Sequence, residues 1–454
     1  MSFALELATR INRLADGPLP EEAFQIVKGS LLDTLGVALA GAHEPAARIP
    51  ARVLDIGSQS GPCVIYGSQE RASALDAALI NGAAAHALDF DDCSTTMGGH
   101  PSVPVLPALI ALGEEIEADG ASLLRAYIAG IETETRLARG LLPCHYEKGW
   151  HPTATLGVFG AAAACGRMLR LDDEALARAL AIAVSLSSGV KANFGTAAKP
   201  LHAGLAARNG LYAARLAKSG FSASADAFEQ VQGFFNLFNG EGLYDADAML
   251  ADWGGTLETL EPGIAIKQHP CCGSAHSAID AALKLRQAHG PFALADIAAI
   301  ETETHVRRLA HTNRTEIKNG LDAKFSVQYL TCRALADGQI RLAHFENGAY
   351  AEAAILDLMS RCTARAHSND DQYLGTVVVT LRNGRVLTEQ ASTPFGRGPD
   401  NPMSRGELTE KFLDCSSRAL ERDKAEALAE SIWRMEQTKN IRDVTTMLAS
   451  GPLQ

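Results

Sequence analysis

Apolar positions recur every three to four residues over most of the first 260 residues, which is the period of an amphipathic α-helix. The pattern predicts helices between Leu5 and Gly41, interrupted by a turn at 14–20. The further predicted helices are 73–92, 103–113, 120–140, 153–169, 172–186 and 203–220. The run Cys63-Val-Ile-Tyr-Gly is strand-like but short. We therefore expect this part of the chain to form an all-α domain.

The pattern changes after Glu261-Pro-Gly. Residues 297–306 alternate between apolar and polar positions, and 373–389 have the pattern of a hairpin with an Asn383-Gly384 turn. Helical periods occupy 274–289, 323–336 and 349–361, and the helical pattern returns from residue 401, with Ser404 as its N-cap. The predicted fold is mostly α: a large, discontinuous all-α domain (1–262 and 398–454) and a smaller α+β lid domain (263–397).

Bulk composition narrows the class of protein. A chain of 454 residues is longer than the roughly 250 to 300 residues that one core usually serves, which favours two domains. The net charge of −12 argues against nucleic acid or an anionic membrane as a partner. No long apolar run and no signal-peptide pattern is seen, so we expect a cytoplasmic protein. Nine scattered cysteines without a CxxC pair argue against a disulfide framework or a zinc ribbon.

The stretch 81–102 concentrates polar groups where a buried, Ala-rich helix is expected to end. His86, Asp89 and Cys93 are spaced three and four residues apart, which would place them on one face of the predicted helix. A Ser/Thr/Gly loop then leads to His100. This arrangement is typical of a site. The alternative is a capped helix end with a solvated Asp-Phe-Asp-Asp tail.

Four basic residues stand directly before a proline that opens a predicted helix: His100, His151, Lys199 and His269. With 13 His in 454 residues, fewer than one of the 18 prolines would follow a His by chance, yet three do. Helix N-termini flanked by basic residues bind anions, so several of them pointing inward would hold a small polycarboxylate. The alternative is a set of separate, solvent-exposed caps.

Further candidate groups surround these positions. Lys191 and His202 flank Lys199 in the sequence, Lys267 marks the domain junction, and Tyr329 begins a helix of the second domain. Junctions between domains are usual places for ligand sites.

Other kinds of active site find little support. The chain has no GxGxxG after a strand, no P-loop, no GxSxG and no HExxH. The contiguous run with Asp89, Asp91 and Asp92 resembles an acidic metal motif, but a second acidic cluster is missing, so we predict no metal and no cofactor. Acid/base chemistry at a carbon beside a carboxylate remains, with lysines to stabilise the enediolate.

Eight segments, in order and over nearly the whole chain, resemble the MmgE/PrpD family. They are Leu32-Asp-Thr-Leu-Gly-Val-Ala-Leu-Ala-Gly, Asn81-Gly through His86-Ala-Leu-Asp-Phe-Asp-Asp, His100-Pro-Ser, Trp150-His-Pro-Thr, Lys199-Pro-Leu-His, Pro270-Cys-Cys-Gly, Lys324-Phe-Ser-Val-Gln-Tyr and Asn401-Pro-Met-Ser. The family includes 2-methylcitrate dehydratase, cis-aconitate decarboxylase and iminodisuccinate epimerase. The resemblance implies a large all-α domain with a smaller α+β lid domain, a homodimer, and a small di- or tricarboxylate substrate.

Carried over position by position, the resemblance implies a set of catalytic residues: His100, Lys199, His151, Tyr329 and Asp89. The candidate substrate-binding residues are Lys267, His202, Cys93, Met97, His145 and Tyr146. Cys93 stands where the decarboxylase has a threonine, and the short Thr95-Thr-Met-Gly-Gly stretch stands where the dehydratases have a longer insert. These departures favour epimerisation slightly over hydro-lyase or decarboxylase activity, and all three share proton abstraction alpha to a carboxylate.

Two hypotheses of other classes remain open at this point. The first is a non-catalytic polycarboxylate-binding protein that has kept the fold. The second is a metal-dependent enzyme that uses Asp89, Asp91 and Asp92, which predicts loss of activity with a chelator.

Overall fold

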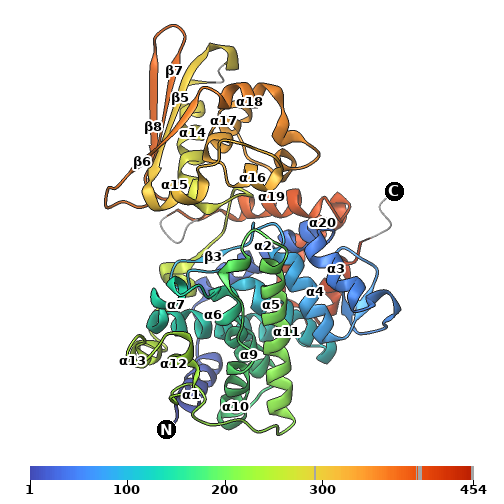
Figure 1. Ribbon diagram of the computed structural model, residues 1–454. Coiled ribbons are helices and arrows are strands. Elements are labelled where there is room, and N and C mark those ends of the chain that lie inside the picture. Colours follow the sequence, from blue (N-terminus) through green and yellow to red (C-terminus); the bar gives the residue numbers. More distant parts are fainter. Residues whose placement is uncertain (291–292, 395, 397–400, 451–454) are drawn as a thin grey trace. The chain divides into compact units, whose positions relative to one another are not determined.

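The computed structural model describes residues 1–290, 293–394, 396 and 401–450. The chain divides into two compact units, Met1–Ile266 with Ser404–Gln454, and Lys267–Met403 (Figure 1). The first predicted boundary, after residue 262, lies four residues before the observed one. The second, between 397 and 398, lies outside the described residues. The mostly-α fold class is confirmed.

The first unit is built from helices. Those before the second unit are α1 (Phe3–Asp16), α2 (Glu21–Gly41), α3 (Pro45–Val53), α4 (Ala74–His86), α5 (Ser102–Ile116), α6 (Gly120–Leu141), α7 (Cys144–Glu147), α8 (Pro152–Thr155), α9 (Gly157–Met168), α10 (Asp173–Val184), α11 (Ala198–Lys218), α12 (Phe234–Phe238) and α13 (Ala246–Leu250). Those after it are α19 (Arg405–Ser416), α20 (Arg422–Trp433) and α21 (Arg442–Thr445). Two short antiparallel pairs join β1 (Cys63–Val64) to β2 (Arg71–Ala72) and β3 (Cys93–Ser94) to β4 (Ile264–Ala265).

Helices α4 and α11 pack closely in the middle of this unit because small residues face one another there. A Cβ on Gly82 would lie 2.9 Å from the Cα of Gly204, and a Cβ on Gly204 would lie 2.2 Å from the carbonyl oxygen of Leu79. Helix α11 also packs against α5, α9 and α10. The two backbones thus bring the C-terminal end of α4 and the N-terminal end of α11 to fixed positions.

Helix α2 is long and apolar enough to cross a membrane by length and composition. However, 83% of its most apolar window is buried inside the unit. That burial is the usual condition of a core helix in a globular protein.

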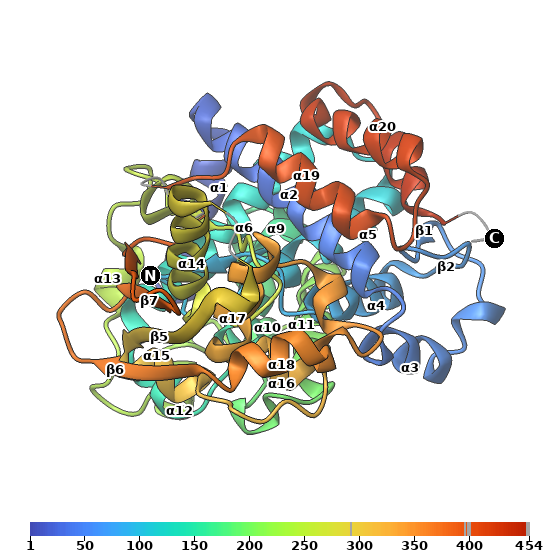
Figure 2. The same cartoon turned by 90° about the horizontal axis from the view of Figure 1, so that it is seen from above.

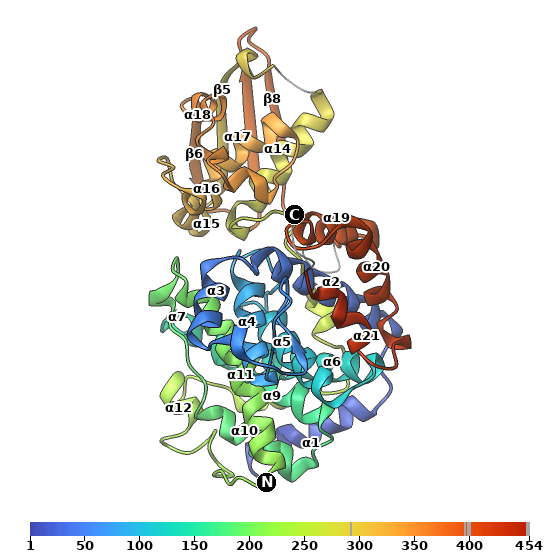
Figure 3. The ribbon, with the colours of Figure 1, turned by 90° about the vertical axis from the view of Figure 1, so that its right-hand side faces the viewer.

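The C-terminal helices return to the first unit, as the sequence predicts. Ser404 caps α19 in a capping box with Glu407, and α19 packs along α2 (Figure 3). From α19, the Lys411 ammonium lies 2.5 Å from a carboxylate oxygen of Asp33 on α2 and donates a hydrogen bond to the carbonyl of Phe90. The end of the chain therefore supports the turn that follows α4.

The second unit contains a four-stranded sheet in the order β6-β5-β7-β8. Its strands are β5 (Ile297–His305), β6 (Cys362–His367), β7 (Gly375–Leu381) and β8 (Val386–Ala391), and its helices are α14 (His276–His289), α15 (Val306–Thr312), α16 (Gly320–Lys324), α17 (Val327–Asp337) and α18 (Ala353–Met359). β5 and β6 are parallel and the other pairs antiparallel. Helix α14 packs on β7 and β8, and α17 on β5 and β6 (Figure 2). The predicted strand at 297–306 and the hairpin at 373–389 are confirmed.

Three sequence predictions differ from the structure. The helix expected over 73–92 ends at His86, because the chain turns there and Asp89 takes a left-handed backbone conformation with φ +53°. The helix expected over 349–361 is a short 3₁₀ turn followed by α18. Strand β6 was not predicted, because half of its residues face solvent and its apolar alternation is weak.

Candidate active site

The polar groups of the stretch 81–102 are brought together by a turn and not by a helix face. His86 is the last residue of α4, and the backbone then turns through Asp89 to β3. The next loop returns His100 to the same place, where its backbone N–H donates to the Thr153 hydroxyl on α8 at 3.0 Å. Residues 86, 89 and 100 therefore converge, but through tertiary contacts.

Asp91 joins two imidazoles. One of its carboxylate oxygens, Oδ2, lies 2.8 Å from Nδ1 of His86 and 2.9 Å from Nδ1 of His100. Asp91 is fully buried and His86 nearly so. The rings of His86 and His100 meet edge to face, with centroids 4.5 Å apart. With Nδ1 engaged by Asp91, His100 presents Nε2 to the surroundings.

Asp89 joins Lys199 to His100. The Lys199 ammonium lies 2.6 Å from Oδ1 of Asp89, and Nε2 of His100 lies 3.4 Å from the same oxygen. Lys199 stands in the first turn of α11, so its charge is placed at the positive end of that helix. The Lys199 ammonium and the end of α11 thus place positive charge beside the partly exposed carboxylate of Asp89.

His151 and His202 form the next part of the cluster. Nδ1 of His151 lies 3.3 Å from Nδ1 of His202 on α11, and the His151 ring stacks on that of His86 with centroids 5.8 Å apart. The ring of Phe194 meets His151 edge to face at 4.9 Å and lies 5.2 Å from the Lys199 ammonium. Phe194 thus adds an apolar wall beside the two charged or titratable groups.

Cys93 completes the cluster on the β3 side. Its sulfur lies 3.8 Å from Nδ1 of His100, and the residue is partly exposed. The thiol therefore lies directly beside the imidazole that Asp91 holds.

The two imidazoles that share Asp91 carry different charges. Burial alone would lower the pKa of His100, but the carboxylate of Asp91 and the Cys93 sulfur outweigh that effect and raise it to about 10. Burial would raise the pKa of Asp91, but His100 and His86 hold it well below its usual value. Near neutral pH the pair is an imidazolium and a carboxylate.

His86 and His151 are neutral in the same pH range. Burial lowers the pKa of His86 to about 4, only partly opposed by Asp91. Burial also lowers the pKa of His151, and the positive charges around it act in the same direction. A proton donor, His100, and a neutral proton acceptor, His151, therefore flank His86 on two sides.

Asp92 serves the turn and not the cluster. Its carboxylate accepts hydrogen bonds from the backbone N–H and the hydroxyl of Ser102, at the start of α5. Burial, together with the charges of Asp33 and Asp91, raises its pKa well above the usual value. The acidic set Asp89, Asp91 and Asp92 is thus not assembled around one point.

The four residues His86, Asp89, Asp91 and His100 have ligand atoms within 4.8 Å of one another, close enough in principle to hold a metal ion. Their arrangement fits hydrogen bonding better. Asp91 already accepts from two imidazoles, and Asp89 faces the Lys199 ammonium, whose charge would repel a cation.

Three of the predicted substrate-binding residues, His145, Met97 and Tyr146, contact other residues of the first unit. Both ring nitrogens of His145 are engaged inside the unit, Nδ1 with Asn239 at 3.1 Å and Nε2 with Thr155 at 2.7 Å. Met97 is fully buried among apolar side chains of the first unit. The Tyr146 ring carries the Lys191 ammonium 3.2 Å from its centroid.

Lys267 and Tyr329 belong to the second unit. Lys267 is its first residue. The Tyr329 hydroxyl donates to the carbonyl of His344 at 2.7 Å and accepts from Arg333, and burial raises its pKa. Their assignment to the site stays a prediction.

The sets of catalytic and substrate-binding residues implied by the resemblance leave out His86 and Asp91. Both lie in the stretch 81–102, but a helix continuing to Asp92 would have pointed Asp91 away from His86. The available signal was the buried environment predicted for two polar residues, since a buried imidazole and a buried carboxylate need partners.

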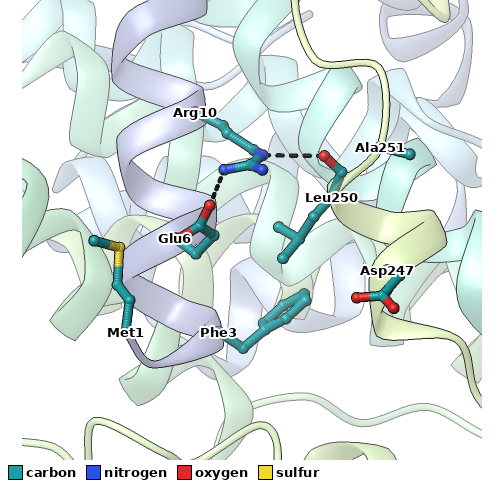
Figure 4. A pocket seen from close by; sticks show the side chains of 7 residues that line it. All are labelled: Met1, Phe3, Glu6, Arg10, Asp247, Leu250 and Ala251. Carbon is teal, nitrogen blue, oxygen red and sulfur yellow. Dashed lines mark hydrogen bonds and ion pairs between the residues drawn. The ribbon is translucent and has the colours of Figure 1, made fainter.

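A separate surface hollow lies between α1 and α13 (Figure 4). Its charged residues on α1, Glu6 and Arg10, bind one another, and Arg10 also donates to the carbonyl of Leu250 at 3.0 Å. Because these charges are satisfied within the protein, the hollow is a poor candidate for an active site.

Comparison with known proteins matches most of the chain to one family. Residues 5–245 match the MmgE/PrpD N-terminal domain, and 269–437 match the MmgE/PrpD C-terminal domain. The chain is 29% identical to cis-aconitate decarboxylase of Homo sapiens over 470 residues, which cover 99% of this chain and 95% of that protein. It is 26% identical over 479 residues to a cis-aconitate decarboxylase-like protein, oryM, of Aspergillus oryzae, covering 99% of this chain and 97% of that one. It is 24% identical over 469 residues to cis-aconitate decarboxylase of Aspergillus terreus, covering 98% and 94%.

The two family models together span most of the chain, and the relatives are matched over nearly their full length. The chain belongs to the MmgE/PrpD family of enzymes.

Proposed function

We propose that this enzyme transfers a proton to or from the carbon alpha to a carboxylate of a small di- or tricarboxylate, without a cofactor. The proposal rests on three different groups that lie close together in the first unit. They are a charged imidazole, His100, a neutral imidazole, His151, and an ammonium group, Lys199. The imidazolium supplies a proton, the neutral imidazole accepts one, and the ammonium stabilises negative charge on the substrate.

Lys199 is the residue we assign to the substrate carboxylate. Its ammonium stands at the N-terminal end of α11 and binds Asp89, the partly exposed carboxylate of the cluster. His202 lies one turn further along α11, beside His151, and burial together with the charge of Lys199 lowers its pKa. A polycarboxylate is the ligand class that fits several positive groups at short range.

The first reaction to test is decarboxylation of a cis-aconitate-type tricarboxylate, because relatives matched over more than 90% of their length carry that name. In such a reaction the carboxylate leaves as CO2, the electron pair of the broken C–C bond forms a new double bond to the neighbouring carbon, and the electrons of the original double bond move to the far carbon. A proton is then added at the far carbon. His100 is the proton donor for this step because it is protonated near neutral pH.

Epimerisation is the second candidate, as favoured by the sequence. It is supported by the presence of both a proton acceptor, His151, and a proton donor, His100, since inversion at carbon requires removal on one face and return on the other. A hydro-lyase of the 2-methylcitrate dehydratase type uses the same donor to protonate a leaving hydroxyl.

One-dimensional proton NMR in D2O distinguishes these reactions. The purified enzyme is incubated with cis-aconitate, iminodisuccinate stereoisomers, 2-methylcitrate and citrate in turn. Loss of an alpha-proton signal without a vinyl signal indicates epimerisation, whereas a new vinyl signal indicates elimination or decarboxylation. A Lys199→Met protein prepared in parallel controls for contaminating activities. No exchange with any of these compounds, while each of them binds, would favour the binding-protein hypothesis instead.

A further inference from the structure

Asp91 and His86 are buried polar residues that take no direct part in the reaction proposed above. Asp91 has a relative exposure of 0% and His86 of 1%, and the two are bonded to each other through Oδ2 of Asp91. Their energetic cost is nonetheless large, because a buried carboxylate and a buried imidazole lose their hydration. Such groups are retained where they act on a neighbour.

The neighbour is His100. Asp91 Oδ2 lies 2.9 Å from Nδ1 of His100, while the other ring nitrogen, Nε2, lies on the side of Asp89 and Lys199. A carboxylate that accepts from Nδ1–H determines which nitrogen of the ring exchanges protons, since the other nitrogen is the one left over.

The role of His86 follows from the same oxygen. Nδ1 of His86 donates to Asp91 Oδ2 at 2.8 Å, so the carboxylate is held from two sides by two rings that lie edge to face. In the described residues no hydrogen-bond partner is found for Nε2 of His86. His86 therefore acts through Nδ1 alone, as a neutral donor that keeps Asp91 from rotating away.

We propose that Asp91, oriented by His86, is the positioning residue that holds His100 charged and presents its Nε2 as the proton-exchanging atom. The role in turnover rests on the proton-transfer function proposed above. The effect on His100 itself does not, and it can be measured without a substrate.

The expected pKa of His100 depends on all the charged or titratable groups around it. On its own side of the fold these are Asp89, Asp91, Cys93 and His86, and from the elements packed against it they are His151 and Lys199. Asp91 is the one fully buried carboxylate among them. Removing the charge of Asp91 should therefore change the pKa of His100 more than removing any other charge in this set.

The test is a titration of His100 by NMR, in protein labelled at the histidine ring carbons, with His100→Gln used to assign its signal. In the wild-type enzyme we expect His100 to stay protonated through pH 8, with Nδ1 and Nε2 both carrying hydrogen. In Asp91→Asn the amide oxygen can still accept from Nδ1, but the charge is lost. We expect the His100 pKa to fall by about 1 to 3 units and the high-pH limb of kcat/KM to move down with it.

Asp92→Asn is the matched control. Asp92 is the next residue in the sequence, is also buried, and accepts hydrogen bonds from Ser102 and not from His100, so this change should leave the His100 titration unaltered. Two His86 variants test the inference independently if Asp91→Asn does not fold. His86→Asn places an amide N–H where Nδ1 stands and should retain kcat, whereas His86→Leu removes the donor and should lower kcat about tenfold with little change in KM.

An unchanged His100 titration in Asp91→Asn, or equal kcat values in His86→Asn and His86→Leu, would overturn the inference. A shifted titration in a protein that shows no turnover with any polycarboxylate would support the positioning role and count against the proposed function. The two failures are thus distinguishable.

Discussion

Asp89 binds Lys199 at 2.6 Å from a backbone conformation that few non-glycine residues adopt. Its φ is +53°, directly after the end of α4, and this turn points the carboxylate at the N-terminal end of α11. A residue held in the left-handed region costs about 1 to 2 kcal/mol unless it is Gly, Asn or Asp. Asp89 is therefore suited both to the turn and to the ion pair with Lys199.

Asp89→Asn and Asp89→Ala separate the two contributions. Asn tolerates the left-handed conformation and Ala does not, so we expect Asp89→Ala to lower the free energy of unfolding by about 1 kcal/mol more than Asp89→Asn. Urea unfolding at pH 7 measures the difference. Equal stabilities would show that the turn relaxes in the alanine variant and that strain is not stored there.

Lys199→Met should abolish most turnover while preserving the fold. The thioether side chain has a similar length and no charge, so the substrate carboxylate and the negative charge of the transition state lose their partner. We expect kcat/KM to fall by about 100- to 1,000-fold. Lys218→Met, at the exposed far end of α11, is the matched control and should retain wild-type kinetics. Retention of more than a tenth of the activity in Lys199→Met would remove this lysine from the site.

The free energy of unfolding should depend on pH in two opposite ways. His86 and His145 have folded-state pKa values lowered to about 4, so unfolding takes up protons between about pH 4 and 6.5, and stability rises with pH there. His100 has a raised folded-state pKa of about 10, so its contribution is complete below about pH 6.5 and is lost as the pH rises towards 10.

Urea titrations at pH 5, 7 and 9 test both limbs. His100→Gln should flatten the decline between pH 7 and 9 and leave the rise between pH 5 and 7. A decline of the same size in this variant would mean that other groups cause it.

Gly204→Ala should destabilise the first unit. The added methyl group would lie 2.2 Å from the carbonyl oxygen of Leu79, which forces α11 away from α4. We expect a loss of about 1 to 3 kcal/mol, together with reduced activity, because these two helices carry Lys199 and His86. The control is Gly406→Ala in α19, where the nearest atom is 3.9 Å away and the position is exposed; it should be neutral or slightly stabilising. Equal effects in the two variants would contradict the packing argument.

Chelation should leave turnover unchanged. The four residues that come within 4.8 Å of one another are already held together by contacts with each other and with Lys199, whose positive charge would repel a cation. Dialysis against EDTA followed by assay, with metal content measured in the same sample, checks this. Loss of activity that a divalent cation restores would replace acid/base chemistry with a metal-dependent mechanism.

The sequence alone was enough to predict the class of fold and much of its layout. Periodicity predicted most of the large helices, the alternation at Ile297 predicted β5, and Asn383-Gly384 predicted the β7–β8 hairpin, because these signals are local. Strand β6 could not be predicted in this way, since its place beside β5 depends on a parallel pairing between residues about 60 positions apart.

The same distinction between local and long-range features applies to the candidate site. The concentration of His, Asp and Lys around 81–102 and at 199 was visible in the sequence, because the residue types and the helix ends that present them are local features. Which residues meet was decided by the tertiary structure. Asp91 reaches both His86 and His100 because the helix stops at His86, and the turn that follows is held in part by Lys411, from a distant part of the sequence, which binds the carbonyl of Phe90. Contacts of that range leave no periodic trace in a sequence, since they depend on how separate helices pack.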